Sequence, residues 1–389
     1  MRSAAQLRRR SETPLSGEEM AVALSTELGG PAHLAFLFAS GLEPETVQGI
    51  AEEFRLALAP QVFLGCTSES VLSTGREVEM EPAASVWAGH LPGAELHPFR
   101  LGNADWVSTL DDPALLRKRV LGPLDPTGVV LLGDPFSSPA EDLLSALGGL
   151  VGQAPVVGGM ASAGRTPGGN LLVLDDEAWA EGAVGVSLGG ALGLEAIVSQ
   201  GCRPVGGFHL VTGTDGNFVT HLSGRPALEV VQEVFDAASP GDQELMEAGL
   251  MAGLVIQEYA DLLGRGSTVV RNILGADPST GALALGDVVQ PGQPLQLQVR
   301  DADSADEEFR RLLSSRRLGS PVGALLFTCN GRGSRLFGEA GHDVAAVDHR
   351  FPGLPLSGFF AAGEVGPVGG RSFLHGHTAS LALFTHRPG

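Results

Sequence analysis

Residues 128–134 read GVVLLGD, and the stretches at 34–40 (LAFLFAS) and 323–329 (GALLFTC) follow the same pattern. Each stretch is a continuous apolar run that ends in small or polar residues. A run of this kind is typical of a strand that is buried on both faces of a sheet. The three stretches therefore predict three equivalent buried strands.

A helical or loop-and-helix stretch, and then a second apolar run, follows each of these strands. The second runs are 61–68 (QVFLGCTS), 155–162 (PVVGGMAS) and 355–364 (PLSGFFAAGE). A strand, a helix and a strand at this spacing predict a βαβ unit with parallel strands. Because ligands usually bind at the edge of a sheet where such turns gather, we expect the small residues of these turns to meet there.

Strand pairs follow the first two βαβ units. They are 85–90 with 95–101 and 181–188 with 194–200. Glycine-containing dipeptides separate the members of each pair and favour tight turns. We therefore predict an α/β (α+β) protein with an internal repeat. Its βαβ-plus-hairpin units form mixed sheets covered by helices, and a layered α-β-β-α sandwich is one arrangement. Residues 225–266 change to a helical pattern, which places a domain boundary near residues 222–240.

The composition restricts the class of protein. With 389 residues, of which 43% are hydrophobic, the chain is long enough for two domains or for one large layered domain. The formal net charge of −20 argues against binding to nucleic acid or to an anionic membrane, because phosphate groups attract basic surfaces. The three cysteines form no CxxC pair, which disfavours a disulfide scaffold and favours a reducing compartment. We expect a cytoplasmic protein without a signal peptide, metal or cofactor.

Polar residues gather on the glycine-rich turns of the last third of the chain. Residues 329–335 (CNGRGSR) follow one buried strand, and residues 363–367 (GEVGP) follow another. An arginine here can clamp a carboxylate with two hydrogen bonds, and Glu364 can pair with an amine. With the equivalent turns of the first two units, the candidate ligand-binding residues are Cys66, Thr67, Ser68, Gly158, Gly159, Cys329, Asn330, Arg332, Arg335, Glu364, Arg371, His375 and His377.

The same residues also admit structural roles. Arg332 and Glu364 can pair with each other to fix their loops, and Cys329 can be a small core residue instead of a reactive thiol. The glycine turns of the first two units can serve strand packing alone. His375 and His377 are too few to define a metal site. A thiol beside a histidine and an aspartate leaves a cysteine-dependent hydrolase or transferase as an alternative, but no catalytic residue is assigned.

Several runs resemble, in their order and approximate spacing, the FIST (F-box and intracellular signal transduction) family. Residues 64–68 (LGCTS) and 155–162 are similar to the N-terminal domain of that family. The resemblance to its C-terminal domain is carried by residues 270–278 (VRNILGADP), 299–305 (VRDADSA), 327–333 (FTCNGRG) and 355–367 (PLSGFFAAGEVGP).

This resemblance implies an organisation and a function. It places an N-terminal domain at 30–222 and a C-terminal domain at 223–389, after a poorly ordered leader at 1–29. It favours a sensory protein that binds a small molecule, an amino acid or another small carboxylate, over an enzyme. Because the sequence leaves no room for an F-box, kinase or cyclase module, we expect the output to pass through a separate signalling protein partner or a homo-oligomer. A protein-interaction scaffold is a further alternative.

Overall fold

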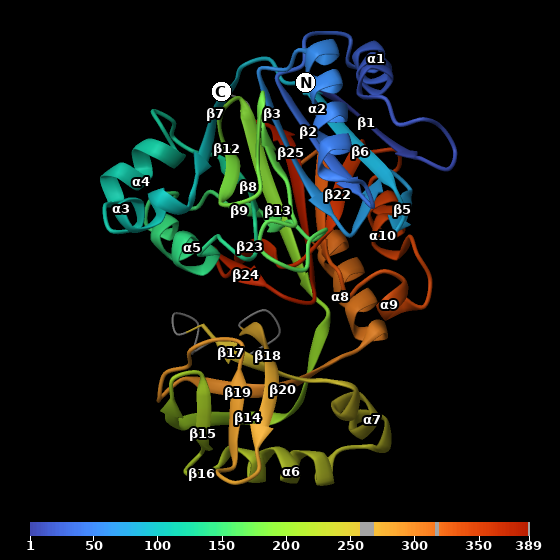
Figure 1. Cartoon of the computed structure of the whole chain (residues 1–389). Coiled ribbons are helices and arrows are strands. Elements are labelled where there is room, and N and C mark those ends of the chain that lie inside the picture. The colour runs from blue at the N-terminus through green and yellow to red at the C-terminus, as the bar shows by residue number, and fades with distance from the viewer. Residues whose placement is uncertain (257–267, 316–318, 388–389) are drawn as a thin grey trace. The chain divides into compact units, whose positions relative to one another are not determined.

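The computed structural model describes residues 1–256, 268–315 and 319–387 (Figure 1). The chain divides into two compact units. The first unit comprises Met1–Val198, Arg310–Leu374 and Thr378–Gly389, and the second comprises Ser199–Phe309 and His375–His377.

The first unit contains three six-stranded sheets that are arranged alike. In each sheet a pair of strands from one βαβ unit lies in the middle, with two strands on one side and a hairpin on the other. The first sheet runs β1 (Arg2–Arg9), β6 (Ala83–His90), β2 (Leu34–Ser40), β3 (Val62–Ser68), β10 (Leu172–Leu174) and β11 (Glu177–Trp179). The second runs β7 (Ala94–Leu101), β12 (Ala183–Gly190), β8 (Gly128–Gly133), β9 (Val156–Met160), β23 (Glu364–Val368) and β24 (Arg371–His375). The third runs β13 (Leu192–Gln200), β25 (Thr378–His386), β21 (Pro321–Cys329), β22 (Leu356–Ala361), β4 (Ser70–Ser73) and β5 (Arg76–Glu79).

A parallel strand pair lies at the centre of each sheet, and these pairs are the predicted ones. They are β2–β3, β8–β9 and β21–β22. Helices α2 (Pro44–Leu58), α5 (Ala140–Gly148) and α10 (His342–Arg350) lie in the connections between the paired strands. The strands of these pairs are buried along their length, except at the ends of β21, where Pro321, Val322 and Cys329 are partly exposed.

The sheets exchange strands with one another. The β4–β5 hairpin, which follows β3, pairs with β22 in the third sheet. In the same way, β10–β11 follows β9 but pairs with β3, and β23–β24 follows β22 but pairs with β9. Every sheet is therefore completed by a hairpin from elsewhere in the chain, so that the first unit cannot be divided at one point of the sequence.

One hydrophobic core lies among the inner faces of these sheets. Its largest side chains include Phe36, Trp87, Phe327 and Phe359, each fully buried. Helices α1 (Gly17–Leu28) and α2 cover the outer face of the first sheet, and α3 (Trp106–Leu110), α4 (Pro113–Val120) and α5 pack on the second. A short 3₁₀ helix, η1 (Asn103–Asp105), precedes α3. The predicted fold class, mixed sheets covered by helices, is confirmed. The two predicted hairpins are wrong, because β6 and β7 belong to different sheets, and so do β12 and β13.

The N-terminal segment is not the poorly ordered leader that we predicted for residues 1–29. Strand β1 pairs with β6 along its whole length, from Arg2 opposite His90 to Arg9 opposite Ala83. Helix α1 begins after Ser16, whose Oγ accepts a hydrogen bond from the Glu19 N–H. Helix α1 also buries an apolar face on the sheet, and this burial offsets the entropy lost on ordering the segment.

The second unit contains a closed antiparallel barrel. Its strands, in spatial order, are β14 (Cys202–Asp215), β20 (Pro294–Arg300), β17 (Leu250–Val255), β18 (Thr268–Asp277), β19 (Ala282–Leu285) and β15 (Phe218–Leu222), and β15 pairs again with β14. A short strand, β16 (Arg225–Pro226), pairs with β15 in antiparallel orientation. Closure leaves the ring without a free edge.

Helices α6 (Ala227–Ala237) and α7 (Pro240–Ala248) pack on this barrel, and α8 (Ala302–Ser315) follows β20. Residues 250–255 were predicted as part of a long helical stretch, and that prediction is wrong. They form β17, because their apolar side chains pair between β18 and β20 and fill the barrel core. The rest of that stretch, residues 257–267, lies outside the described residues. Within the described part of the chain, no helix is long and apolar enough to cross a membrane.

Candidate functional site

The turns that follow β3, β9 and β22 lie together in the first unit. Ser162, just after β9, joins all three of them. Its N–H donates to the Thr67 carbonyl oxygen (3.2 Å), and its Oγ donates to the Phe360 carbonyl oxygen. The same Oγ accepts a hydrogen bond from the Glu69 N–H (2.9 Å). The chain reversals after the second strand of each βαβ unit thus meet in one region, as expected for parallel strand pairs.

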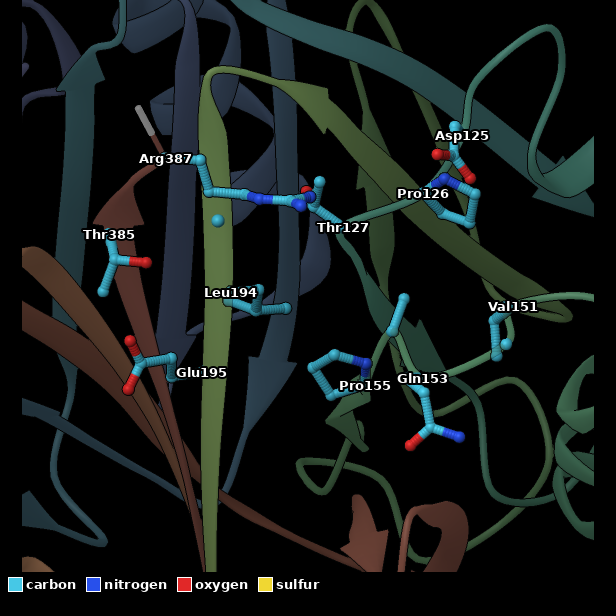
Figure 2. A pocket seen from close by; sticks show the side chains of 13 residues that line it. Asp125, Pro126, Thr127, Val151, Gln153, Pro155, Leu194, Glu195, Thr385 and Arg387 are labelled. Atoms are coloured by element: carbon cyan, nitrogen blue, oxygen red, sulfur yellow. The ribbon is translucent and has the colours of Figure 1, made fainter. Parts of the chain in front are cut away.

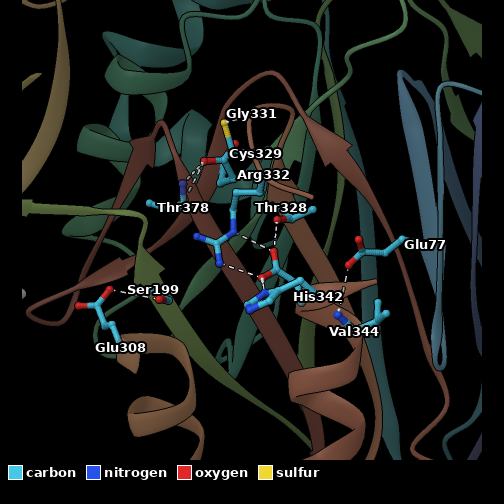
Figure 3. Close-up of polar contacts among 12 residues, drawn as sticks. Glu77, Ser199, Glu308, Thr328, Cys329, Gly331, Arg332, His342, Val344 and Thr378 are labelled. Carbon is cyan, nitrogen blue, oxygen red and sulfur yellow. Dashed lines mark hydrogen bonds and ion pairs between the residues drawn. The ribbon is translucent and has the colours of Figure 1, made fainter. Parts of the chain in front are cut away.

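A buried ion pair fills the space at the carboxyl ends of β21 and β22. The Arg332 Nε donates a hydrogen bond to Asp343 Oδ2, and its Nη2 donates one to Oδ1. The donor–acceptor distance is 2.8 Å in both (Figure 3). Thr328 Oγ1 adds a 2.6 Å hydrogen bond to Asp343 Oδ2. Arg332 is fully buried. Burial disfavours its charged form, but Asp343 outweighs that effect and raises the pKa of Arg332.

Glu364, the first residue of β23, lies near this ion pair and is also fully buried. Its Oε2 accepts hydrogen bonds from the Thr378 N–H (3.0 Å) and from Thr378 Oγ1 (2.7 Å). Burial raises the pKa of Glu364 to about 8, although Thr378, Arg332 and the Cys329 thiol each act to lower it. Glu364 therefore holds a proton at neutral pH. Together, Thr328, Cys329, Arg332, Asp343, Glu364 and Thr378 are called the ionic cluster below.

A carboxyl group from a distant part of the sequence borders the ionic cluster. Glu77, on β5, accepts hydrogen bonds from the Gly341 N–H (2.7 Å) and the Val344 N–H (3.2 Å) and so caps the start of α10. Burial, and the charge of Asp343 beside it, raise the pKa of Glu77 to about 7. The β4–β5 hairpin thus holds the helix that presents Asp343 to Arg332.

The carboxyl ends of β2 and β3 are different, because a pocket of about 420 Å³ opens there. We call it the β2–β3 pocket. It is lined by Gly41, Leu42, Glu43, Pro44, Thr67, Ser68, Glu69, Met80, Ala163, Arg165 and Gly169. The turn out of β2 needs glycine at position 41, where φ is +61° and an added Cβ would lie 2.9 Å from the Pro82 nitrogen.

Polar groups of both signs surround the β2–β3 pocket. Arg165 is exposed and makes no ion pair with another described residue. Helix α2 begins at Pro44 in the pocket wall, so the partial positive charge of its N-terminus lies there as well. Glu43 and Glu69 supply carboxylates. The pocket can therefore hold a small polar molecule that carries both charges.

A second hollow, of about 500 Å³, lies at the amino ends of β8 and β9. Residues 125–127 and 151–155 form its walls, and the Arg387 side chain extends toward Thr127 (Figure 2). In open α/β sheets, ligands bind outside the carboxyl ends of the strands. For this reason we assign the candidate site to the β2–β3 pocket and not to this hollow.

The predicted site residues fall into two neighbouring groups. Cys329, Asn330, Arg332 and Glu364 lie at or beside the ionic cluster, whereas Thr67 and Ser68 line the β2–β3 pocket. Arg335 links the two groups. It forms an ion pair with Glu69 of the pocket wall, and its Nη1 donates to the Asn330 carbonyl oxygen (2.8 Å). The interpretation that Arg332 and Glu364 pair with each other is wrong, because the hydrogen bonds of Arg332 go to Asp343.

The remaining predicted residues lie elsewhere. Cys66 is fully buried in the core, and burial raises its pKa well above the usual range. Gly158 and Gly159 serve strand packing, since an added Cβ would lie 1.8 Å from the Leu131 carbonyl oxygen at the first position and 2.9 Å from the Ala361 Cβ at the second.

Arg371, on β24, lies over the Phe373 ring, 5.9 Å from its centroid. His375 and His377 belong to the second unit. There His377 Nε2 lies 2.7 Å from Asn272 Oδ1, and burial, with the Arg300 charge, lowers the pKa of His377 to about 4. Among the described residues, no group of three or more His, Cys, Asp or Glu side chains could hold a metal ion.

Sequence reasoning missed Asp343, Glu77, Ser162 and Arg165. Asp343 offered a weak signal, because an acidic residue in the first turn of a helix is common, but nothing local indicates its partner. Glu77 and Ser162 act through contacts with residues 264 and 198 positions away. Arg165 lies in a loop whose sequence, GRTPGG, predicts only a turn.

Comparison with known proteins gives two kinds of match. Residues 33–225 match the family model of the FIST N domain, and residues 227–367 match that of the FIST C domain. The chain is 40% identical over 362 residues to the uncharacterized protein Rv0628c of Mycobacterium tuberculosis, with 92% of each chain covered. It is also 40% identical over 365 residues to the uncharacterized protein Mb0898c of Mycobacterium bovis, again with 92% of each chain covered.

Proposed function

This chain belongs to the FIST family, and on that basis we propose that it is a sensory protein that binds an amino acid or another small carboxylate in the β2–β3 pocket. The family is generally associated with signal transduction and small-ligand sensing. The single observation that carries the proposal is a pocket of about 420 Å³ at the carboxyl ends of a parallel strand pair. The bound state is passed on through a separate protein partner.

The charges of the pocket favour a ligand with a carboxylate. Arg165 supplies a cation that no other described side chain neutralises, and the N-terminus of α2 adds a partial positive charge. Glu43, on the same wall, is an acceptor for an ammonium group. A zwitterionic amino acid satisfies both, and this makes it the first ligand class to test.

Binding in this pocket has a route to the rest of the first unit. Glu69 lines the pocket, and its carboxylate holds Arg335, which follows β21. Its N–H also donates to Ser162, which joins the turns after β3, β9 and β22. A ligand ammonium that competes for Glu69 would therefore weaken its hold on Arg335, and the surface around Arg335 is where we place the docking site of the partner.

A thermal-shift screen tests the proposal. The panel contains amino acids, carboxylates that lack the amine, and amines that lack the carboxylate. A ligand at one hundred times its dissociation constant stabilises the folded state by about 2.7 kcal/mol, which is readily measured. We expect stabilisation by members that carry a carboxylate. No shift with any of them would overturn the proposal.

Two matched variants locate the site. Arg165→Ala should abolish the ligand-induced shift, because the carboxylate loses its charged partner. Arg387→Ala removes the corresponding cation of the hollow at the amino ends of β8 and β9 and should leave the shift unchanged. The reverse result would move the ligand to that hollow and contradict the assignment.

A further inference from the structure

Cys329 lies at the end of β21 in surroundings that neither other cysteine has. It is partly exposed, whereas Cys66 is fully buried. The Gly331 N–H donates a hydrogen bond to the Cys329 Sγ, with a nitrogen–sulfur distance of 3.4 Å. Figure 3 shows the Cys329 sulfur at one end of the ionic cluster, on the same side as the backbone end of Arg332. A backbone donor and a guanidinium beside a sulfur stabilise the thiolate form.

Two buried polar atoms of the ionic cluster have no hydrogen-bond partner. They are Arg332 Nη1 and Glu364 Oε1, and both side chains are fully buried. Buried polar groups nearly always have hydrogen-bond partners. A buried group without one is often explained by a ligand that binds there or by a chemical role. Both side chains interact with Cys329: a hydrogen bond with Cys329 acts to lower the pKa of Glu364, against the larger effect of burial, and the charge interaction with Cys329 acts to raise the pKa of Arg332. The two side chains that carry the unpartnered atoms thus both interact with Cys329.

We propose that Cys329 is an oxidation site for small hydroperoxides, with Glu364 as the proton carrier and Arg332 as the group that stabilises negative charge on the reacting oxygen. Arg332 keeps its two hydrogen bonds to Asp343 throughout, which leaves Nη1 for the substrate. The Thr378 hydrogen bonds hold Oε2 of Glu364, which leaves Oε1 for the proton.

The step balances with a hydroperoxide as the oxidant. In the molecules in which Glu364 is ionised, a fraction that grows as the pH rises toward 8, its carboxylate takes the proton of the thiol. The thiolate sulfur then attacks the terminal oxygen of the hydroperoxide. An S–O bond forms and the O–O bond breaks. The leaving alkoxide, or hydroxide for hydrogen peroxide, takes a proton from Glu364. The cysteine is oxidised by two electrons to a sulfenic acid, and the hydroperoxide is reduced to an alcohol or to water.

Hydroperoxides fit this arrangement better than alkylating electrophiles do. Their leaving group is a strongly basic oxygen, which needs a proton and a stabilising positive charge. Glu364 and Arg332 supply these two things through the atoms that have no partner in the structure. A halide leaving group would need neither of them.

Cys202 provides an internal control, because it is partly exposed like Cys329 but has a thioether, Met251 Sδ, at 3.4 Å from its sulfur. The full-length protein is treated with hydrogen peroxide at pH 7, trapped with dimedone, and analysed by peptide mass spectrometry. A free thiol is only a few per cent ionised at this pH, so a stabilised thiolate gains on the order of 10-fold in rate. We expect labelling of Cys329 to exceed that of Cys202 by about this factor. Equal labelling, or an unlabelled Cys329, would overturn the proposal.

Glu364→Gln separates proton transfer from simple packing, because glutamine keeps the shape and an acceptor for Thr378. The variant should label more slowly at Cys329 and should lose the rise in rate that the wild type shows between pH 7 and pH 9. Labelling of Cys202, in the second unit, should not change, and the circular dichroism spectrum of the variant should match that of the wild type. An unaltered pH profile at Cys329 would exclude Glu364 as the proton carrier.

Discussion

The carboxyl ends of β2–β3 and of β21–β22 hold equivalent positions in two sheets that have the same strand order, yet one is hollow and the other is filled. At β2–β3 a pocket of about 420 Å³ is open. At β21–β22, Arg332 and Asp343 occupy the corresponding place with no exposed surface on the arginine. The same backbone arrangement therefore produces a binding site in one sheet and an internal ionic cluster in the other.

The connection that follows the first strand of each pair causes this difference. After β2 the chain enters α2 through a short turn at 41–43, whose residues line the β2–β3 pocket. After β21 it passes through residues 330–341, including α9 (Ser334–Phe337), before α10 begins. That longer segment carries Arg332 back over the strand ends, and α10 presents Asp343 to it. The segment that follows the first strand of the pair, and not the order of the strands, therefore distinguishes the filled edge from the open one.

The largest expected change in unfolding free energy comes from removing one partner of the buried ion pair at the ends of β21 and β22. Arg332→Ala leaves Asp343 as a buried charge without its partner, and a broken buried pair costs about 3–5 kcal/mol of unfolding free energy. Urea denaturation of the full chain, followed by circular dichroism, measures this loss. The matched control is Arg335→Ala, because Arg335 forms a partly exposed ion pair with Glu69 and should cost no more than about 1 kcal/mol. Equal losses in the two variants would contradict the distinction between a filled and an open edge.

The second effect depends on pH and concerns Glu364. Its pKa of about 8 in the folded protein lies above the ordinary value, so the folded state keeps a proton that the unfolded chain has released. The stability that this protonated group contributes is complete below the ordinary pKa and is lost as the pH rises through 8. Glu364→Gln cannot titrate. The variant should therefore gain stability relative to the wild type by roughly 2 kcal/mol between pH 5 and pH 7.

Unfolding curves of both proteins across that range measure the relative change. Glu77→Gln extends the test, because the pKa of Glu77 is raised to about 7 and the change should have the same sign. A constant difference between wild type and Glu364→Gln at all pH values would show that the buried carboxyl does not hold its proton.

The central strand pairs were predictable from the sequence because they are buried on both faces. A strand in that position is apolar at nearly every residue, so it can be recognised in the sequence without knowledge of the neighbouring strands. For example, a strand was predicted at 34–40, and β2 is Leu34–Ser40. The exchange of hairpins between sheets was not predictable, since β4 pairs with β22 through contacts nearly three hundred positions apart. The ordered N-terminal strand was missed for a related reason. Its arginines read as a solvated leader, whereas Arg8 and Arg9 pair with acidic residues at the surface.

The candidate site was predictable only as far as backbone topology determines it. Parallel strands bring their following turns together, so Thr67, Ser68, Cys329, Arg332 and Glu364 were expected in one region. Which of them face a hollow depends on side chains that arrive from other elements. The glycine-rich turns that follow two buried strands suggested Glu364 as the partner of Arg332, but Asp343 at the start of α10 is the partner instead. The glycines of β9 looked like site residues because close strand packing and ligand approach both require a missing Cβ.

The smallest effect on stability is expected when a large side chain is introduced into the β2–β3 pocket. Ala163 is exposed and lines the β2–β3 pocket, so Ala163→Trp should change the unfolding free energy by no more than about 0.5 kcal/mol. The indole would occupy the space that the proposed ligand needs, and the ligand-induced thermal shift should disappear. Ala57→Trp, on the exposed side of α2, is the matched control and should keep the shift. If Ala163→Trp bound the ligand normally, the open edge would not be the binding site. If it unfolded the protein, the space at the ends of β2 and β3 would be part of the packed structure, and the two edges would differ less than their shapes indicate.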